Sequence, residues 1–275
     1  MRLHPAEEAS YSDSSQAKSE GQASAPGLSL KTGWAGADET VASSHCKVHI
    51  QPGFDWRAAD AYLFDIDGTL LNSRDAVHYH AFHRAVEQVF GLDFRIDGVP
   101  VHGNTDVGIL RAYLEVANVA EATWRPRLNE VIELMSSDVE RGAAELRPEL
   151  CPAVLELLQQ LKAAGKLLGV ASGNLERVGW AKLRACGLRD FFRFGAFSGK
   201  HERRDDVIAD GIRKAQALRE NSLIYVVGDT PADIHSAHAN NIAAIAVATG
   251  IYKFEELLAH APEMCISGCG GLLQS

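Results

Sequence analysis

The stretch AYLFDIDGTLL, residues 61–71, joins a short apolar run to two carboxylates placed two residues apart. Ala61–Phe64 has the length and character of a buried parallel strand. Asp65 and Asp67 follow at its carboxyl end, which is where open α/β sheets bind ligands. Gly68 permits a tight turn that keeps both carboxylates clear of their own backbone. Two acids beside a buried strand are costly without a cation, so the stretch predicts a catalytic loop.

Further along the chain, short apolar runs alternate with segments of helical periodicity. This alternation predicts an α/β fold with an open parallel sheet and right-handed crossovers. The expected strands are Ala61–Phe64, Leu167–Ala171, Leu223–Val227 and Ala243–Val247, and the expected helices are Ala153–Ala164, Leu175–Cys186, Asp206–Leu218, Ala232–Ala239 and Phe254–Ala261.

One interval breaks the alternation, because residues 74–150 show three helical patterns and no convincing strand. The patterns cover Ala76–Phe90, Asp106–Ala117 and Trp124–Ala144. We interpret 74–150 as a small all-helical domain inserted after the first strand, which leaves 56–73 and 151–275 as a discontinuous α/β core. Residues 1–55 are rich in Ser, Ala, Gly and Gln without hydrophobic periodicity, which predicts a disordered extension with one short strand near Lys47–Ile50.

Composition excludes several classes of protein. The 275 residues carry 27 basic and 36 acidic side chains, a net charge of −9 without a long basic run, so a nucleic-acid partner is not expected. The five cysteines are odd in number and form no CxxC pair, which indicates reduced thiols and no zinc site. No apolar run is long enough to span a bilayer, and no secretory signal is visible, so we expect a cytoplasmic protein without a membrane anchor.

Two further strand ends carry polar residues. Ser172 and Gly173 follow the predicted strand that ends at Ala171, and they offer a hydroxyl and backbone N–H groups to an anion. Asp229 follows Val227, and Pro231 suits the first turn of a helix, which places Asp233 near its start. Together with the first stretch, these acids predict a Mg²⁺ site made by Asp65, Asp67 and Asp229.

A basic segment, GKHERRDD at residues 199–206, precedes a predicted helix. A cation from this segment would balance the first carboxylate and an incoming phosphate. We expect Arg204 to take this place, with Lys200 as the alternative.

These four segments, in this order, resemble the haloacid dehalogenase-like hydrolase superfamily over residues 56–275, and within it the phosphoglycolate-phosphatase-like branch with a helical cap. The resemblance implies a Rossmann-like core with the cap above the site. It also implies that Asp65 is a nucleophile forming an aspartyl phosphate, and that Asp67 is the acid and base. Ser172 is implied to bind the transferring phosphoryl group, and Asp229 to bind Mg²⁺, supported by Asp233.

The resemblance also has implications for how Asp67 contacts the metal and for the type of bond that is cleaved. The backbone carbonyl of Asp67 is the implied metal contact of that residue. An acid at this position disfavours carbon–halogen cleavage, because it serves to protonate a departing ester oxygen. Many family members place a Lys-Pro pair in the third motif, whereas His201 follows Lys200 in this chain, which is why Arg204 is preferred.

In the cap, residues 102–110 resemble a GxTD turn that faces the site or simply caps a helix through Thr105 or Asp106. His78 and His83 lie on the first predicted cap helix, where we expect surface histidines, with a place facing the substrate as the alternative. The predicted activity is Mg²⁺-dependent hydrolysis of a small phosphorylated metabolite. Alternatives are a phosphomutase of the β-phosphoglucomutase type and, with less support, a non-catalytic binding protein. The motifs specify neither the particular ester nor the oligomeric state.

Overall fold

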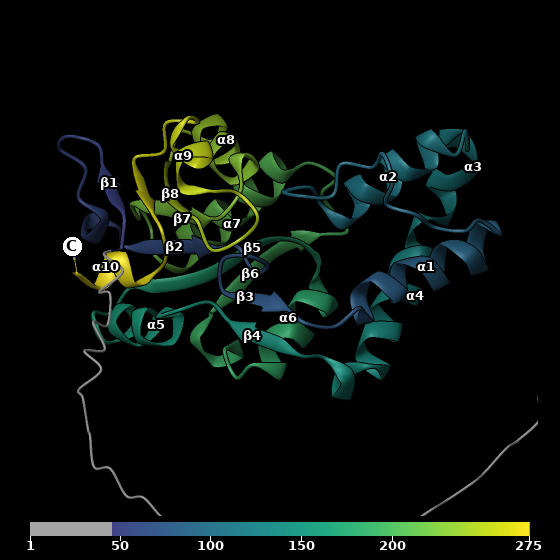
Figure 1. The fold of residues 1–275 in the computed structure, drawn as a ribbon, viewed down its shortest axis with the longest axis horizontal. Helices are drawn as coiled ribbons and strands as arrows, with labels where there is room; N and C mark the ends of the chain where they lie inside the picture. The colour runs from purple at the N-terminus through teal and green to yellow at the C-terminus, as the bar shows by residue number, and fades with distance from the viewer. Residues whose placement is uncertain (1–45, 275) are drawn as a thin grey trace, which may run out of the picture. The chain divides into compact units, whose positions relative to one another are not determined.

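The computed structural model describes residues 46–274, in which the strands form two sheets (Figure 1). The strands are β1 Val48–Ile50, β2 Ala61–Phe64, β3 Leu71–Ser73, β4 Pro148–Leu150, β5 Leu167–Leu175, β6 Phe194–Ser198, β7 Ile224–Gly228, β8 Ala243–Val247 and β9 Met264–Ile266. Seven of them form one sheet in the order β1-β9-β8-β7-β2-β5-β6. All neighbours in it are parallel except β1 and β9, and β3 pairs with β4 in the small second sheet. The predicted parallel α/β sheet is therefore confirmed.

Most helices follow the predicted periodic segments, whereas the last helix of the chain was not predicted. They are α1 Val77–Phe90, α2 Asp106–Val116, α3 Glu121–Trp124, α4 Leu128–Arg141, α5 Val154–Ala163, α6 Glu176–Ala185, α7 Arg204–Leu218, α8 Pro231–Ala239, α9 Phe254–Leu258 and α10 Gly270–Gln274, with short 3-10 turns at Trp56–Ala58, Arg125–Arg127, Ala143–Glu145 and Arg189–Phe191. The helix expected over Trp124–Ala144 is divided, because Pro126 lies in the turn between α3 and α4 and has no N–H to continue the ladder.

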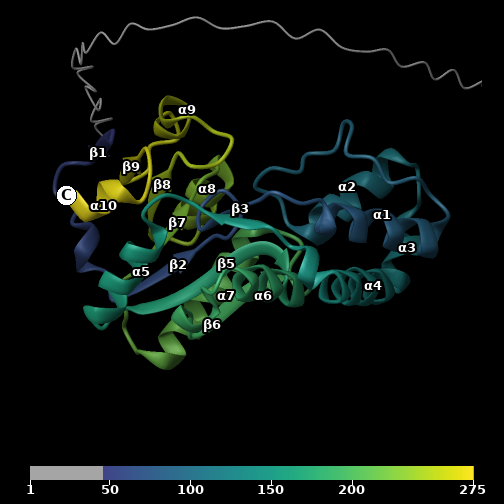
Figure 2. The same cartoon turned by 60° about the horizontal axis from the view of Figure 1, so that its bottom comes forward.

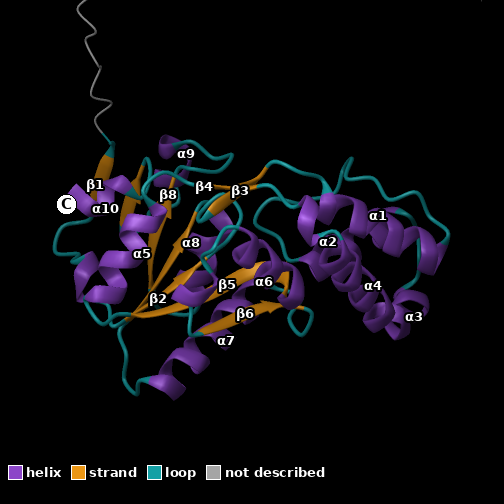
Figure 3. Ribbon diagram, turned by 90° about the horizontal axis from the view of Figure 1, so that it is seen from below, coloured by secondary structure: helices purple, strands orange, loops and turns teal. Residues whose placement is uncertain are grey.

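Strand β2 contributes side chains to apolar clusters on both faces of the sheet. All four of its residues are buried, and alternate side chains point to opposite faces of the sheet. Tyr62 and Phe64 pack into one apolar cluster with leucines of α5, whereas Ala61 and Leu63 pack into another with apolar residues of α7 and α8. Helices therefore cover both faces of the parallel sheet, as Figure 3 shows in purple and orange.

Helices α1 to α4 lie between β3 and β4 in the chain, and we call this segment the cap (Figure 2). It has an apolar cluster that includes Phe82, Leu114 and Met135, joined by a few core residues from the start of α6. The expectation of no strand within 74–150 is wrong at its end, because β4 pairs with β3. Each is three residues long, too short for a periodic pattern, and their pairing comes from the fold rather than from local sequence.

The predicted disordered extension over 1–55 is wrong for its last ten residues, and its remainder lies outside the described residues. The short strand expected near Lys47–Ile50 is confirmed as β1, in which Val48 pairs with Ile266 of β9. Phe54 packs against the sheet and lies 5.0 Å from the ring of Tyr225. Partners more than 160 residues away order this segment, so its own composition could not indicate it.

The structure also bears on the expectations for the cysteines and for membrane-spanning segments. All five cysteines are free thiols, as expected, with Cys151, Cys265 and Cys269 buried. Between residues 46 and 274, no helix combines the length and apolar character needed to cross a bilayer.

Candidate active site

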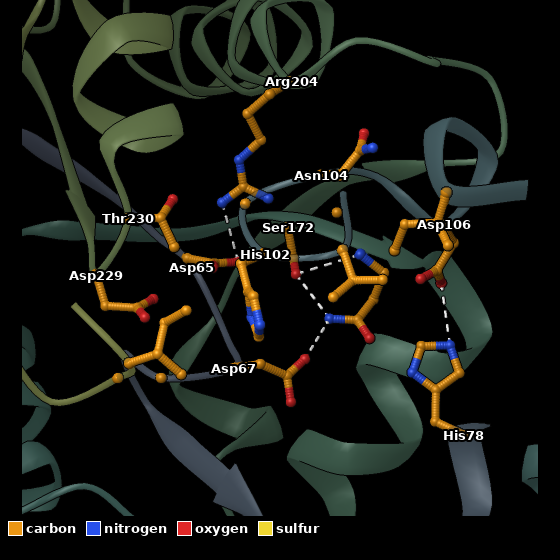
Figure 4. A pocket seen from close by; sticks show the side chains of 18 of the residues that line it. Asp65, Asp67, His78, His102, Asn104, Asp106, Ser172, Arg204, Asp229 and Thr230 are labelled. Carbon is orange, nitrogen blue, oxygen red and sulfur yellow. Dashed lines mark hydrogen bonds and ion pairs between the residues drawn. The ribbon is translucent and has the colours of Figure 1, made fainter. Parts of the chain in front are cut away.

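The sheet order brings the predicted motifs together, because β2 lies between β5 and β7. Parallel strands end at the same edge, so the residues at their carboxyl ends meet there. A cavity of about 320 Å³ opens at this edge (Figure 4). Six of the seven predicted site residues line it, and they are Asp65, Asp67, Ser172, Gly173, Arg204 and Asp229.

Asp65 and Arg204 form a buried ion pair in this cavity. The Arg204 guanidinium lies 3.0 Å from Oδ1 of Asp65 and also contacts Oδ1 of Asp233. Arg204 begins α7 and is 8% exposed, so its charge is held at the cavity wall. Lys200, the alternative cation, is exposed and lines a different cavity. The structure thus places Arg204, and not Lys200, beside Asp65.

Three buried carboxylates, including that of Asp65 itself, lie close together at this edge of the sheet. Asp65, Asp229 and Asp233 each place an oxygen within 4.8 Å of the others. Asp233 is already engaged, because its carboxylate accepts hydrogen bonds from the N–H and hydroxyl of Thr230 in a capping box. Asp229 accepts one from Thr69 at 3.1 Å. Burial raises the pKa of Asp229 to about 8 and that of Asp65 to about 6, with each negative neighbour adding to the rise.

This acidic cluster fits a divalent cation. The guanidinium of Arg204 contacts Asp65 and Asp233 but no such contact joins it to Asp229, and hard carboxylate oxygens are what Mg²⁺ prefers. Gly68 has φ +81°, and a Cβ there would lie 2.2 Å from an Asp229 oxygen. The absence of a side chain at Gly68 therefore leaves room for the Asp229 carboxylate in this cluster. The carboxylate of Asp67 is outside the cluster, and the metal contact predicted for Asp67 is through its backbone carbonyl.

The raised pKa values give a pH-dependent prediction for the metal-free protein. In the folded protein Asp229 keeps its proton up to about pH 8, whereas in the unfolded chain an aspartate releases its proton near its ordinary pKa. The free energy of unfolding of the metal-free protein therefore falls as the pH rises from that ordinary pKa to about 8. Mg²⁺ binds the charged form, so the increase in Tm caused by MgCl₂ should grow between about pH 6 and 8. Thermal unfolding with MgCl₂ or EDTA across this range measures it. Asp229→Asn should abolish the growth, and an increase in Tm that is equal at every pH would contradict the prediction.

Asp67 is held by a polar network that the sequence analysis missed. Lys182 Nζ lies 2.9 Å from Oδ1 and 2.7 Å from Oδ2 of Asp67, and Asn174 donates to Oδ2 at 2.8 Å. Partial loss of hydration raises the pKa of Asp67, but the charge of Lys182 and these hydrogen bonds outweigh it and bring the pKa below its ordinary value. One signal was available in the sequence, since Lys182 lies four residues after the buried Val178 on the predicted helix and so shares its buried face.

The cap supplies the opposite wall of the cavity. Residues of the predicted turn, His102, Gly103, Asn104 and Asp106, line it together with His78 of α1. Asp106 is buried at the start of α2 and accepts a hydrogen bond from the Leu175 N–H at 2.7 Å, which ties the cap to the core. His78 Nε2 lies 3.2 Å from the same carboxylate (Figure 4). His83 contacts Asp93 instead.

Gly173 lies where the backbone of the cap approaches the core closely. A Cβ at this position would lie 2.3 Å from the backbone oxygen of Asn104 and 3.1 Å from the Cα of Thr105. Only a glycine allows this contact without a shift of the cap turn. The backbone of residues 103–105 is thereby held directly against the phosphate-binding segment predicted at Ser172 and Gly173.

Gly173→Ala is therefore expected to displace the cap turn and lower kcat/KM about 100-fold, because a shift on the order of 1 Å at an active site has that effect. Gly270→Ala is the matched control, since its added Cβ would meet nothing closer than 3.7 Å. Steady-state kinetics and thermal unfolding of both variants measure the effect. Unchanged kcat/KM in a folded Gly173→Ala protein would contradict the expectation.

Comparison with known proteins identifies the family. The family model described as haloacid dehalogenase-like hydrolase matches residues 62–247. A phosphoglycolate phosphatase of Synechococcus elongatus is 27% identical over 228 residues, which cover 78% of this chain and 96% of that protein. Among solved structures, a predicted phosphatase from Clostridium acetobutylicum aligns with a TM-score of 0.56 at 21% identity, covering 74% of this chain and 92% of its own.

A predicted phosphoglycolate phosphatase from Haemophilus somnus aligns with a TM-score of 0.53 at 19% identity, covering 75% of this chain and 92% of its own. These two structures agree with the observed fold. The family match spans β2 to β8, and hence the cap and every predicted site motif. The resemblance, the Rossmann-like fold and the assignment to hydrolases are confirmed, and this chain belongs to the haloacid dehalogenase-like hydrolase family.

Proposed function

We propose that this protein is a Mg²⁺-dependent phosphatase that hydrolyses a small phosphate monoester through an aspartyl phosphate on Asp65. The observation that carries this proposal is the buried Asp65–Arg204 pair beside an acidic cluster, at the edge where three parallel strands end. The pair supplies a nucleophile and a fixed positive charge within one small cavity. The phosphoglycolate phosphatase among the relatives supports a phosphate ester as substrate.

The first half-reaction uses residues that already face one another. A carboxylate oxygen of Asp65 attacks phosphorus, the phosphorus–ester oxygen bond breaks, and Asp67 transfers a proton to the departing oxygen. Because the pKa of Asp67 lies below its ordinary value in the free protein, this step uses the protonated form, which the negative charge of a bound phosphate favours. Arg204 balances the charge on the transferring group. The Ser172 hydroxyl and the N–H groups near Gly173 line the same cavity and would bind the phosphoryl oxygens.

The second half-reaction restores the enzyme. Asp67 accepts a proton from water, the water oxygen attacks phosphorus, and the bond to Asp65 breaks to release inorganic phosphate. Asp65, Asp229 and the backbone carbonyl of Asp67 would hold Mg²⁺, with Asp233 behind them. When bound, the ion neutralises charge on the phosphoryl oxygens and on the crowded carboxylates.

The cavity favours a small polar substrate. Its volume of about 320 Å³ and its charged and polar lining suit the phosphate and a short polar group. The cap wall offers His78 and His102, which suit a carboxylate or hydroxyl group on the far end of the substrate, whereas the Asn104 amide is hydrogen-bonded within its own turn. We therefore propose a short phosphorylated acid or polyol, with phosphoglycolate as the first compound to test.

Phosphate release from a panel of monoesters, with Mg²⁺ and then with EDTA, tests the proposal. The panel contains phosphoglycolate, glycerol phosphates, sugar phosphates and nucleoside monophosphates. Metal-dependent release that favours the short esters is the expected result. Conversion of a sugar phosphate into its isomer in the presence of its bisphosphate, without phosphate release, would indicate the phosphomutase alternative. Neither phosphate release nor isomerisation by a folded protein would indicate the binding-protein alternative.

A further inference from the structure

Lys182 is a buried cation whose contacts go entirely to the active site. It projects from the last turn of α6, its side chain is 5% exposed, and its ammonium group contacts Asp67 Oδ1, Asp67 Oδ2 and Asn174 Oδ1 at 2.7 to 2.9 Å. An ammonium group has three donors, so these contacts occupy all of them. Lys182 therefore has no donor left for a substrate phosphate, although it lines the cavity.

Close packing of α6 against the core allows this contact. Gly179 lies one turn before Lys182, and a Cβ there would lie 3.0 Å from Ile66 Cδ1 and 2.6 Å from the ring of Phe197. The absence of a side chain lets the helix approach the loop that carries Asp65 and Asp67. Lys182 then reaches Asp67 from within the core rather than from solvent.

Stability does not account for the ion pair. The side chain of Asp67 is 41% exposed and its carboxylate could be hydrated without a partner, whereas the Lys182 side chain is 5% exposed, so burying its ammonium group is costly. An apolar side chain of similar length would fill the same space without this cost. The pair therefore serves the site rather than the core.

We propose that Lys182, oriented by Asn174, is a positioning residue that holds the carboxylate of Asp67 in one orientation beside Asp65. This inference rests on the proposed function, in which Asp67 serves both half-reactions. Asn174 is central to it, because its amide nitrogen donates to Asp67 and to the Ser172 hydroxyl, both at 2.8 Å, while its oxygen accepts from Lys182. The network thus aligns the proton-transfer group with the proposed phosphoryl-binding hydroxyl.

The effect of holding the Asp67 carboxylate in place on the rate depends on the leaving group of the ester. An alkyl alcohol departs only with a proton from Asp67, whereas p-nitrophenolate departs without one. Hydrolysis of the aspartyl phosphate needs Asp67 in either case. Loss of the Lys182 contact should therefore slow both steps for an alkyl phosphate but only the second step for p-nitrophenyl phosphate.

Lys182→Met tests this inference. We expect kcat for the best alkyl phosphate of the panel to fall about 100-fold, the low end of the contribution of proton transfer, with KM changed less than about threefold. With p-nitrophenyl phosphate, a burst of about one p-nitrophenolate per enzyme should precede a slow steady state. Rapid-quench trapping of the phosphorylated protein measures the accumulated intermediate.

The control is Lys214→Met, because Lys214 pairs with Asp210 at 2.8 Å in α7, outside the catalytic cavity, and should keep wild-type kinetics. If Lys182→Met does not fold, Lys182→Ala is assayed with added ethylammonium, which should restore part of kcat. Wild-type kinetics in a folded Lys182→Met protein, or equal loss for both esters without a burst, would overturn the inference. Failure of the wild type and Lys214→Met to release phosphate from any ester would instead overturn the proposed function.

Discussion

Asp65→Asn is expected to abolish phosphate release, with kcat lowered by a factor on the order of 10⁴ to 10⁶, as for the loss of other enzymatic nucleophiles. Asparagine keeps the size of the side chain and can still accept a hydrogen bond from Arg204. It cannot form an acyl phosphate through a charged oxygen. The substitution also removes one of three crowded negative charges, so the protein should remain folded and gain stability without metal.

The control for this substitution is Asp60→Asn, at the opposite end of the same strand. The Asp60 carboxylate accepts a hydrogen bond from the Leu223 N–H at 3.0 Å, which an asparagine oxygen can also accept. Phosphate release and trapping of the phosphorylated protein should be normal in Asp60→Asn and absent in Asp65→Asn. Normal turnover in Asp65→Asn would exclude Asp65 as the nucleophile and, with it, the proposed mechanism.

Asp67→Asn is expected to lower kcat by about 10² to 10⁴, the range that proton transfer by a side chain contributes. The asparagine oxygen can still accept from Lys182, so the side chain keeps its place while it loses the ability to move a proton. The phosphorylated form should then accumulate with p-nitrophenyl phosphate, because water has no base to assist its attack. Quench-flow with this ester and steady-state assays with an alkyl phosphate separate the two steps.

Asp97→Asn, a substitution at an exposed cap residue, provides the matched control and should leave both rates unchanged. A folded Asp67→Asn protein that turned over alkyl esters at the wild-type rate would assign the proton transfer elsewhere. His78 and His102 line the same cavity and would be the next groups to test.

The site could be predicted from sequence to the extent that its residues follow strand ends. Asp65, Ser172 and Asp229 each come at or just after the end of a predicted apolar strand, and adjacent parallel strands bring such residues together. Arg204 was preferred over Lys200 by resemblance alone. Its place beside Asp65 depends on α7 beginning at that residue, which the sequence indicates only within a turn.

The missed features depend on contacts between distant segments. Lys182 appeared as an ordinary helical lysine, because nothing local shows that α6 approaches the Asp67 loop at Gly179. Strands β6 and β9 were not predicted. Phe194–Ser198 contains a glycine and only a few strongly strand-forming residues, and Met264–Ile266 is too short to show periodicity. Both become strands because a neighbouring strand offers its backbone groups.

The contact between Gly173 and the carbonyl of Asn104 has a consequence for how this enzyme could diverge. Because main chain meets main chain there, a cap exchanged from a relative must follow the same path at this point. New preferences would then arise by changing other side chains of the cap wall, such as His102 and Ile109. Asn104 would be kept, because its amide donates to a carbonyl and accepts from an N–H within this turn. A library limited to His102 and Ile109 would therefore explore new substrates while leaving the phosphoryl-transfer machinery intact.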